Sequence, residues 1–297
     1  MWLTLAVLSS FLLGIYDLFK KGSLRQNPFL PVLFLATSTG AIIFGTLVTF
    51  SRTGVLNSES LLYVPAISLY EHFLFFLKAI IVGTSWFFAY MALSNLPITI
   101  VVPIRSTGPI WTVTGALIIY HERFTEIQWI GIILAIISSY VFAWAGRKEG
   151  INFMKNKWIY AIVLATIIGS VSALYDKFLL QHYNRMAVQS WFSIYMVFVL
   201  LPFVLIMWYP KRQELTPFRW TWTIPAIGLT LSLADFLYFY ALSMPESLIG
   251  VVSVLRRSSV IVAFILGALV FKETNVKKKA IGLIGLLGAS IILILGS

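Results

Sequence analysis

The chain has 297 residues, of which 59% are hydrophobic and 11% are charged, and its formal net charge is +11. Soluble globular domains carry about a quarter charged residues, so this composition excludes a water-soluble fold and indicates an integral membrane protein. The basic residues lie between apolar stretches, which favours contact with anionic lipid headgroups and excludes a nucleic-acid-binding role. The absence of cysteine excludes a disulfide framework and a thiolate site.

Ten apolar stretches follow one another along the chain, each about as long as the roughly 20 residues that a helix needs to cross the hydrocarbon core. The first stretch has neither the basic start nor the cleavage site of a signal peptide, so it is predicted to be a retained helix. The sequence therefore predicts an all-α integral membrane protein with ten transmembrane helices. They are expected near residues 2–20, 30–50, 73–94, 98–120, 126–145, 157–178, 187–208, 222–243, 248–271 and 279–296.

The segment from Trp86 to Trp144 is repeated from Asp235 to Leu295, and each copy has three apolar stretches separated by two short polar breaks. An internal repeat of this size constrains the whole fold. Arg105 aligns with Arg256 once a shift of two residues in the preceding loop is allowed. The other matches are Ala92-Leu93-Ser94 with Ala241-Leu242-Ser243, Gly115-Ala116-Leu117 with Gly267-Ala268-Leu269, Glu122 with Glu273, and Gly131 with Gly282.

The basic connection Gly146–Lys157 divides the predicted spans into five and five, which gives one repeat at residues 1–148 and another at 157–297. Tyr16-Asp17, near the end of the first span, corresponds to Tyr175-Asp176, near the end of the sixth. Because five is odd, the second half enters the membrane from the opposite side. The sequence thus predicts two inverted five-helix repeats, a layout that many transporters use to place a substrate site between the halves.

Lysine and arginine are distributed unevenly between the two sets of loops. Loops one, five, seven and nine are rich in both, whereas the other side holds only Arg52, Arg123 and Arg185. The excess of basic residues marks the cytoplasmic side. We therefore expect loops one, five, seven and nine in the cytoplasm of a bacterial-type inner (plasma) membrane, and both termini outside.

The first copy has a distinctive pattern, with Ala-Leu-Ser before the fourth span, Pro109 within it, and Tyr120-His121-Glu122-Arg123-Phe124-Thr125 before a glycine-containing fifth span. The second copy shares Leu242, Gly267-Ala268-Leu269, Lys272-Glu273-Thr274 and Gly282 with this pattern. On these residues the chain resembles the EamA-like branch of the drug/metabolite transporter superfamily. The resemblance covers nearly all of the chain and implies ten helices, alternating access and export of small metabolites.

Two features depart from that family. The second copy reads Arg256-Arg257-Ser258-Ser259 and has no proline equivalent to Pro109. In addition, familiar members keep both termini in the cytoplasm, whereas the loop charges here favour the reverse orientation. We follow the loop charges, because members of this superfamily insert either way.

Ionisable residues inside a membrane span are expensive and usually face a cavity or a partner. At a rise of about 1.5 Å per residue, Arg105 lies roughly 12 Å inside the fourth span, and Asp17 lies about 5 Å inside the first, on the same side. Repeat symmetry gives Asp176 and Arg256 the same relation, and Asp235 is level with Arg256. Each half is therefore predicted to hold a carboxylate and an arginine that meet across the bundle.

A structural role is the alternative for these charges. Asp17 and Asp176 are also compatible with ion pairs to the neighbouring Lys20 and Lys177. Lys78 lies close enough to its helix end to reach the interface with its ammonium group.

Roles follow from these positions. Trp86 with Tyr90, and Asp235 with Tyr238, each share one helix face and are predicted to form the pocket wall. Arg256 is expected to contact an acidic group of the substrate, and Arg257 to be structural and paired with Asp235. The substrate-binding candidates are Arg105, Arg256, Trp86, Tyr90, Tyr238 and Lys78, and the coupling or gating candidates are Asp235, Asp17, Asp176, Tyr16 and Tyr175.

Other residues are predicted to shape the fold. Pro109 should bend the fourth span, as a static kink or as a gating element. Glu122 and Glu273 should cap the fifth and tenth spans. The small residues Gly282, Gly285, Gly288 and Ala289 should allow close packing within the fold or in a homodimer.

The sequence thus predicts a secondary active transporter that exports a small anionic or zwitterionic metabolite by alternating access. Its cavity should be lined by spans one, three, four, six, eight and nine, with the proton as a candidate coupling ion. No enzyme motif, cofactor site or metal-ligand spacing is present, and the histidines lie at loop edges. A lipid or lipid-linked flippase and a non-transporting membrane scaffold are the alternatives.

Overall fold

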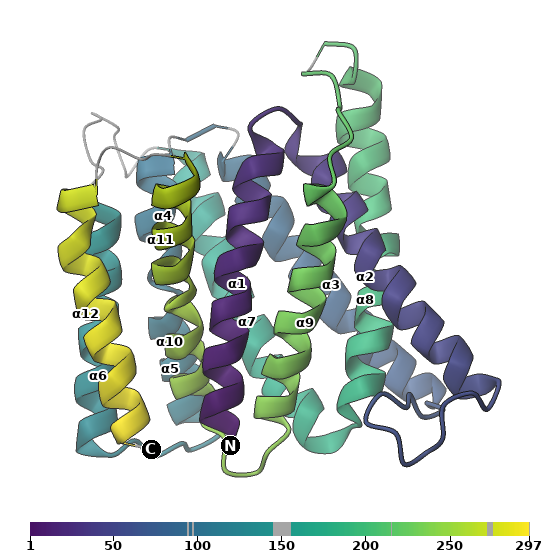
Figure 1. The fold of residues 1–297 in the computed structure, drawn as a ribbon, viewed down its shortest axis with the longest axis horizontal. Helices are drawn as coiled ribbons and strands as arrows, with labels where there is room; N and C mark the ends of the chain where they lie inside the picture. Colours follow the sequence, from purple (N-terminus) through teal and green to yellow (C-terminus); the bar gives the residue numbers. More distant parts are fainter. Residues whose placement is uncertain (94, 97, 145–155, 215, 272–275, 297) are drawn as a thin grey trace.

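The computed structural model describes residues 1–93, 95–96, 98–144, 156–214, 216–271 and 276–296, and these residues form helices and connections without a strand. The helices assemble side by side into one bundle (Figure 1). Their bounds are α1 Trp2–Leu24, α2 Phe29–Arg52, α3 Leu69–Leu93, α4 Ile98–Arg105, α5 Gly108–Ile119, α6 Glu126–Trp144, α7 Lys157–His182, α8 Arg185–Phe203, α9 Thr223–Leu242, α10 Ile249–Arg257, α11 Ser259–Phe271 and α12 Val276–Leu295, with a π turn at Val204–Trp208 and a 3-10 turn at Tyr209–Lys211 after α8.

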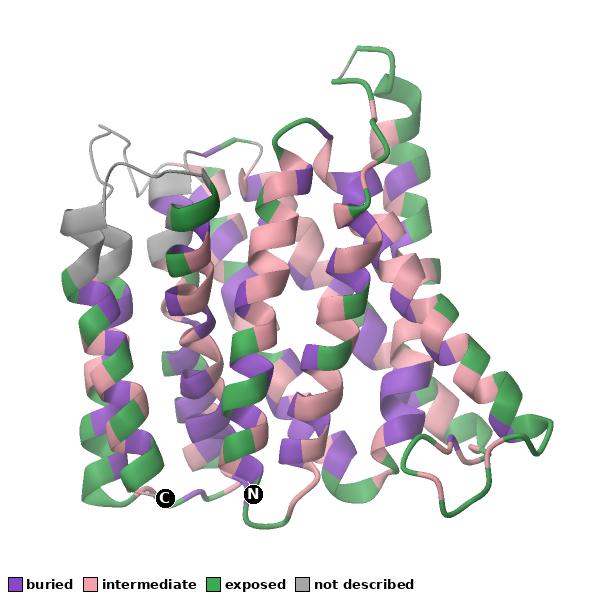
Figure 2. Ribbon diagram, viewed as in Figure 1, coloured by how far each residue is buried: buried purple, intermediate pink, exposed green. Residues whose placement is uncertain are grey.

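The outer face of the bundle is apolar. Ile42, Ile118 and Leu269 are 69%, 68% and 73% exposed, which in water would leave a large surface unburied. Exposed residues lie along the outward faces of the helices and not only at their ends (Figure 2). Such a surface suits contact with lipid chains, and the prediction of an all-α membrane protein is confirmed.

Seven helical stretches of the described part are long and apolar enough to cross a membrane, when α8 is counted with the turns that follow it and α10 with the adjoining α11. They are Trp2–Leu24, Phe29–Arg52, Leu69–Leu93, Lys157–His182, Arg185–Lys211, Thr223–Leu242 and Ile249–Gly267. The predicted fourth, fifth and tenth spans correspond to shorter apolar helices at Gly108–Ile119, Glu126–Val141 and Ile281–Leu295. The count of ten spans therefore stays a prediction.

The two halves of the chain are interleaved. α1 packs chiefly on α9, and α3 packs chiefly on α7, while α2 lies against α8 and α6 against α12. Each of these pairs joins the first half to the second, so neither half forms a core of its own. In the α6–α12 pair, a Cβ at Gly285 would lie 2.1 Å from the Ser138 hydroxyl, so this glycine serves close packing within one chain.

The predicted fourth span is broken in two. α4 ends at Arg105 and α5 begins at Gly108, with Pro109 in the first turn of α5. At the break, the Thr107 N–H donates to the Ile104 carbonyl (3.1 Å) and the Ile110 N–H donates to the Thr107 carbonyl (2.9 Å). A proline at the start of a helix has no N–H to continue the preceding helix, which explains the interruption.

The predicted ninth span breaks at the corresponding place. The Ser258 N–H donates to the Leu255 carbonyl (3.0 Å) and the Ile261 N–H donates to the Ser258 carbonyl (2.9 Å). This hydrogen-bond pattern repeats that of the first break, in the register that aligns Arg105 with Arg256. The half-helix α4 ends at Arg105, and α10 ends at Arg257, one residue after the counterpart of Arg105.

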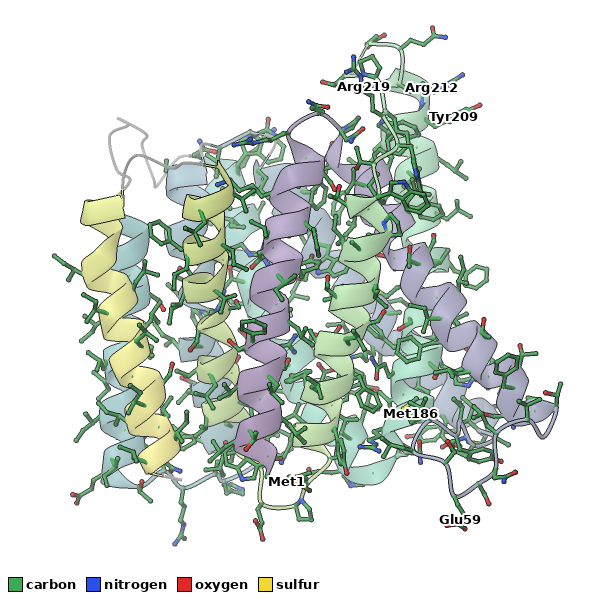
Figure 3. All side chains as sticks on the ribbon, in the orientation of Figure 1. Met1, Glu59, Met186, Tyr209, Arg212 and Arg219 are labelled. Carbon is green, nitrogen blue, oxygen red and sulfur yellow. The ribbon has the colours of Figure 1, made fainter. Side chains whose placement is uncertain are left out.

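The bundle has two distinct ends. Arg212 and Arg219 lie at one end, here called the basic end, and Met1 and Glu59 lie at the opposite end, here called the terminal end (Figure 3). Both ends of the chain lie at the terminal end (Figure 1). This arrangement requires an even number of crossings, as the sequence predicted.

Candidate functional site

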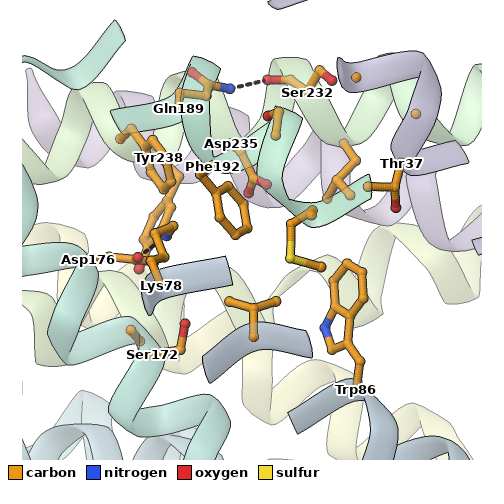
Figure 4. A pocket seen from close by; sticks show the side chains of 18 of the residues that line it. Thr37, Lys78, Trp86, Ser172, Asp176, Gln189, Phe192, Ser232, Asp235 and Tyr238 are labelled. Atoms are coloured by element: carbon orange, nitrogen blue, oxygen red, sulfur yellow. Dashed lines mark hydrogen bonds and ion pairs between the residues drawn. The ribbon is translucent and has the colours of Figure 1, made fainter. Parts of the chain in front are cut away.

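A cavity of about 280 Å³ lies among α2, α3, α7, α8 and α9. We call it the neutral chamber, because two cations and two carboxylates line it; Figure 4 shows Lys78, Asp176 and Asp235 among them. The cations are Lys78 and Arg256, and the carboxylates are Asp176 and Asp235. Trp86, aromatic and sulfur-containing side chains of α8 and α9, and small or polar residues of α2, α7, α8 and α9 line the rest of it.

Lys78 and Asp176 form a buried ion pair between α3 and α7. The lysine is 2% exposed, and its Nζ lies 4.3 Å from the ring centroid of Phe192 and 4.6 Å from that of Phe239. The expectation that Lys78 reaches the interface is wrong, since α3 begins at Leu69 and holds it deep in the bundle. The alternative pairing of Asp176 with its neighbour Lys177 is also wrong.

Asp235 and Arg256 form the second ion pair of this chamber, at 2.9 Å. The Arg256 guanidinium also lies 3.8 Å from the ring centroid of Tyr238, which is itself 3% exposed. The sequence predicted that Arg257 would pair with Asp235, and the structure gives that partner to Arg256 instead. The directions of the Arg256 and Arg257 side chains depend on where α10 ends, and the end of this helix could not be predicted from the sequence.

A second cavity of about 360 Å³ lies among α3, α4, α5, α7 and α10. We call it the cationic chamber, because Arg105, Arg256 and Arg257 line it and none of the described residues in its wall is a carboxylate. The two chambers share Trp86, Tyr238 and Arg256 in their walls. The rest of the cationic chamber is rich in hydroxyl groups, from Ser85, Thr112, Thr166, Ser170, Ser172, Ser253 and Ser259.

The break at Pro109 connects the two halves directly. Pro109 has no N–H to donate to the carbonyl of Arg105, four residues earlier, so that oxygen stays available. The Arg257 guanidinium donates to it at 2.8 Å. Gly108 leaves room for this contact, since a Cβ there would lie 2.6 Å from an Arg257 nitrogen. An arginine of the second half thus replaces the hydrogen bond that proline removes from the first.

Asp17 lies at the edge of this region, on α1. It interacts electrostatically with Lys20 and, more weakly, with Arg105 and Arg257. These are the partners that the sequence suggested for Asp17, a neighbouring lysine and an arginine across the bundle, and its ion pairing with either stays a prediction. The Lys20 ammonium lies 5.2 Å from the ring centroid of Tyr16, the residue before Asp17.

Glu122 caps a different helix from the one predicted. Its carboxylate accepts the backbone N–H groups of Ile249 (2.7 Å) and Gly250 (3.1 Å) at the start of α10, in the other half of the chain. Burial raises the pKa of the Glu122 carboxyl, and the two backbone N–H groups and Lys177 oppose that shift. The equivalent Glu273 lies outside the described residues.

Lys177 secures the same end of the bundle. Its ammonium donates to the Ser247 carbonyl (2.5 Å) and hydroxyl (2.7 Å), just before α10 begins. Lys177 and Ser247 are each 2% exposed. Together with Glu122, they fix the start of the half-helix that carries the two arginines at its far end.

Two predicted aromatic residues lie elsewhere. Tyr90 stacks on Phe29, with 5.5 Å between ring centroids, and lines neither chamber. The Tyr175 hydroxyl donates to the Leu74 carbonyl at 3.3 Å and lines neither chamber either. The other substrate-binding candidates, Trp86, Tyr238, Lys78, Arg105 and Arg256, line one or both chambers.

The sequence missed the contribution of α2 and α8. All six predicted spans reach one of the chambers, but Thr37 of α2 and Gln189, Phe192 and Met196 of α8 also line the neutral chamber. The Gln189 amide donates to the Ser232 carbonyl of α9 at 2.9 Å (Figure 4). A glutamine within an otherwise apolar span was a signal for this face.

Groups of three or more histidine, aspartate or glutamate side chains able to hold a metal ion do not occur in the described part of the chain. The arrangement offers instead a pair of adjoining polar chambers in the middle of the bundle. Fixed charges line both, which suits reversible binding of a small polar solute.

Comparison with known proteins agrees with this architecture. A family model described as the EamA-like transporter family matches residues 1–144 and 156–295. No curated protein sequence matches the chain. Among solved structures 29 chains match, and one, described only as a crystal structure of a protein, has a TM-score of 0.73 at 15% identity, covering 99% of this chain and 96% of its own. At that identity the likeness shows the fold alone.

Proposed function

Because the chain belongs to the EamA-like transporter family, we propose that it is a secondary active transporter of a small anionic or zwitterionic metabolite. The observation that carries the proposal is the cationic chamber, a cavity whose described wall holds three arginines and no carboxylate. Arginine binds carboxylates and phosphates through paired hydrogen bonds, so an acidic group is the natural occupant.

Alternating access is proposed from the way the halves are interleaved. Exchanging the two predicted five-span repeats converts the α1–α9 contact into the α7–α3 contact, and both are extensive. The paired breaks after Arg105 and Arg257 add a second correspondence. These relations support ten spans in two inverted repeats, which rock about the chambers between them.

Proton coupling is proposed through the carboxylates near the chambers. Asp176 and Asp235 line the neutral chamber, each next to a cation, and Asp17 lies beside Arg105. Protonation of any of these aspartates would free a positive charge and change the affinity for an anion. Export across the inner (plasma) membrane, with both termini outside, completes the proposal.

The test is transport by purified protein in liposomes, with a panel of metabolic acids, amino acids and neutral solutes under an imposed pH gradient. We expect uptake of acids or zwitterions, loss of that uptake in Arg105→Gln, and no uptake in empty liposomes. Loss of the pH response in Asp176→Asn or Asp235→Asn would identify the coupling carboxylate. Movement of labelled lipid in place of every solute would favour a flippase, and no movement at all would favour a scaffold.

A further inference from the structure

The three arginines of the cationic chamber are not equivalent. Arg256 is committed to Asp235 and covered by the Tyr238 ring. Arg105 and Arg257 make no ion pair within 4.0 Å in the described part of the chain, and the carboxylate that interacts electrostatically with both is Asp17. The two groups available to an incoming anion are therefore Arg105 and Arg257, one from each half.

The charge of the occupant follows from this arrangement. Lys78 with Asp176 and Arg256 with Asp235 are neutral pairs. Arg105 and Arg257 then share the single carboxylate of Asp17, which itself interacts most strongly with Lys20. Lys20, Arg105 and Arg257 together carry three positive charges against the one carboxylate of Asp17, which leaves two positive charges without a counter-charge, so an acidic group on the ligand is favoured.

The hydroxyl groups define what the rest of the ligand must offer. Ser85 donates to the Ala165 carbonyl (2.8 Å), and Thr166 donates to the Ile162 carbonyl (2.7 Å). Ser170 and Thr112 both donate to the Gly108 carbonyl, at 3.0 and 3.3 Å. A hydroxyl has one proton and two acceptor sites, so these four oxygens can only accept further hydrogen bonds.

We propose, on the basis of the proposed transport function, that the cationic chamber binds a small organic anion rich in hydrogen-bond donors, such as a hydroxylated acid. Arg105 and Arg257 hold its acidic group, and the oxygens of Ser85, Thr112, Thr166 and Ser170 accept from its hydroxyl or amino groups. Aliphatic and aromatic acids of the same size fit poorly, because they leave those oxygens without donors. A cavity of about 360 Å³ admits a solute of this size.

The test is a binding measurement on purified full-length protein by isothermal titration calorimetry. Two matched pairs of probes differ only in their hydroxyl groups, namely gluconate against hexanoate and lactate against propionate, with glucose as the neutral hydroxylated probe. We expect the hydroxylated acid of each pair to bind at least tenfold tighter than its partner, and gluconate at least tenfold tighter than glucose. Equal or tighter binding of the plain acids, or no binding of either hydroxylated acid, overturns the proposal.

Variants assign the binding to these residues. Arg105→Gln and Arg257→Gln should each weaken gluconate binding at least tenfold, whereas Arg185→Gln, whose guanidinium stacks on Tyr240 outside both chambers, should leave it unchanged. If a glutamine variant does not fold, the lysine variant replaces it, since lysine keeps the charge but loses the planar fork. Thr166→Val should reduce the preference for gluconate over hexanoate about tenfold and leave hexanoate binding unchanged.

The outcomes separate this inference from the function on which it rests. If liposomes take up an acid without donor groups and hexanoate binds tightly, the transport function is supported and the proposal of a donor-rich ligand is refuted. Arginine-dependent binding of gluconate in protein that moves no solute supports the site and refutes transport. Wild-type gluconate affinity in both arginine variants refutes the assignment of the anion to Arg105 and Arg257.

Discussion

Replacing Lys78 by methionine should strongly destabilise the protein, because it leaves the Asp176 carboxylate buried without its cation. Removing one partner of a buried ion pair costs about 3–5 kcal/mol. Lys78 is 2% exposed and lies over two aromatic rings, which places it in this class. The nearby Arg256 and the adjoining chamber relieve part of the loss. We expect the free energy of unfolding to fall by about 3 kcal/mol.

The assay is equilibrium unfolding in mixed micelles with increasing SDS, followed by tryptophan fluorescence. Lys211→Met, an exposed lysine in the turn after α8, is the control and should change the free energy by less than about 0.5 kcal/mol. The double variant with Asp176→Asn should recover about 2 kcal/mol relative to the sum of the single variants. A loss below about 1 kcal/mol for Lys78→Met, or strict additivity in the double variant, would refute the buried pair.

Three other predictions test separate parts of the molecule. Glu122→Gln should lower the free energy of unfolding by about 1–2 kcal/mol, because the side chain that caps α10 loses its charge. The control Glu126→Gln, at an exposed position, should have little effect. Equal effects of the two variants in SDS titrations would contradict the capping role of Glu122. Gly228→Ala should lower the free energy of unfolding by about 3 kcal/mol, since its Cβ would lie 2.1 Å from the Ala36 carbonyl oxygen. The control Gly45→Ala meets no atom within 4 Å and should change the free energy of unfolding by less than about 1 kcal/mol. An unchanged free energy of unfolding in Gly228→Ala would argue against the close α2–α9 contact. A reporter active only in the cytoplasm should be silent when fused after Ser297, and activity there would reverse the predicted orientation while leaving the repeat intact.

The positions of the helices could be predicted because the apolar stretches and the repeat are visible in the sequence. Their ends could not, since the backbone hydrogen bonds continue past the hydrocarbon layer into polar residues. α7 extends to His182, beyond the expected end at residue 178, and α3 begins four residues before the expected 73. The latter difference moves Lys78 from near a helix end to the interior of the bundle.

The residues of the site could be predicted better than their partners. An ionisable residue in an apolar span has few reasons to be there other than a cavity or a partner, so Lys78, Asp176, Asp235 and Arg256 were identified from the sequence. Choosing between two adjacent arginines requires the angle at which α10 ends. That angle depends on the turn at Ser258, and the sequence there has neither a proline nor a glycine that would predict a helix break.

The partner of Glu122 was beyond sequence reasoning for a different reason. A capping carboxylate is usually assigned to the helix that follows it, and here α6 begins four residues later, at Glu126. The packing of the turn against Gly250 brings the carboxylate to the start of α10 instead, where a Cβ on that glycine would lie 2.5 Å from Phe124. Only the juxtaposition of the two halves reveals this contact.

The two helix breaks differ in one respect that gives the halves unequal mechanical freedom. Pro109 makes the first break permanent, because no movement can supply the missing N–H. In the register of the repeat its counterpart is Val260, which retains an N–H able to bond to the Arg256 carbonyl. The ninth span can therefore straighten into one continuous helix, whereas the fourth cannot. Straightening would turn the side chain of Arg257 about the helix axis and withdraw it from the Arg105 carbonyl, a change for which the fourth span has no equivalent.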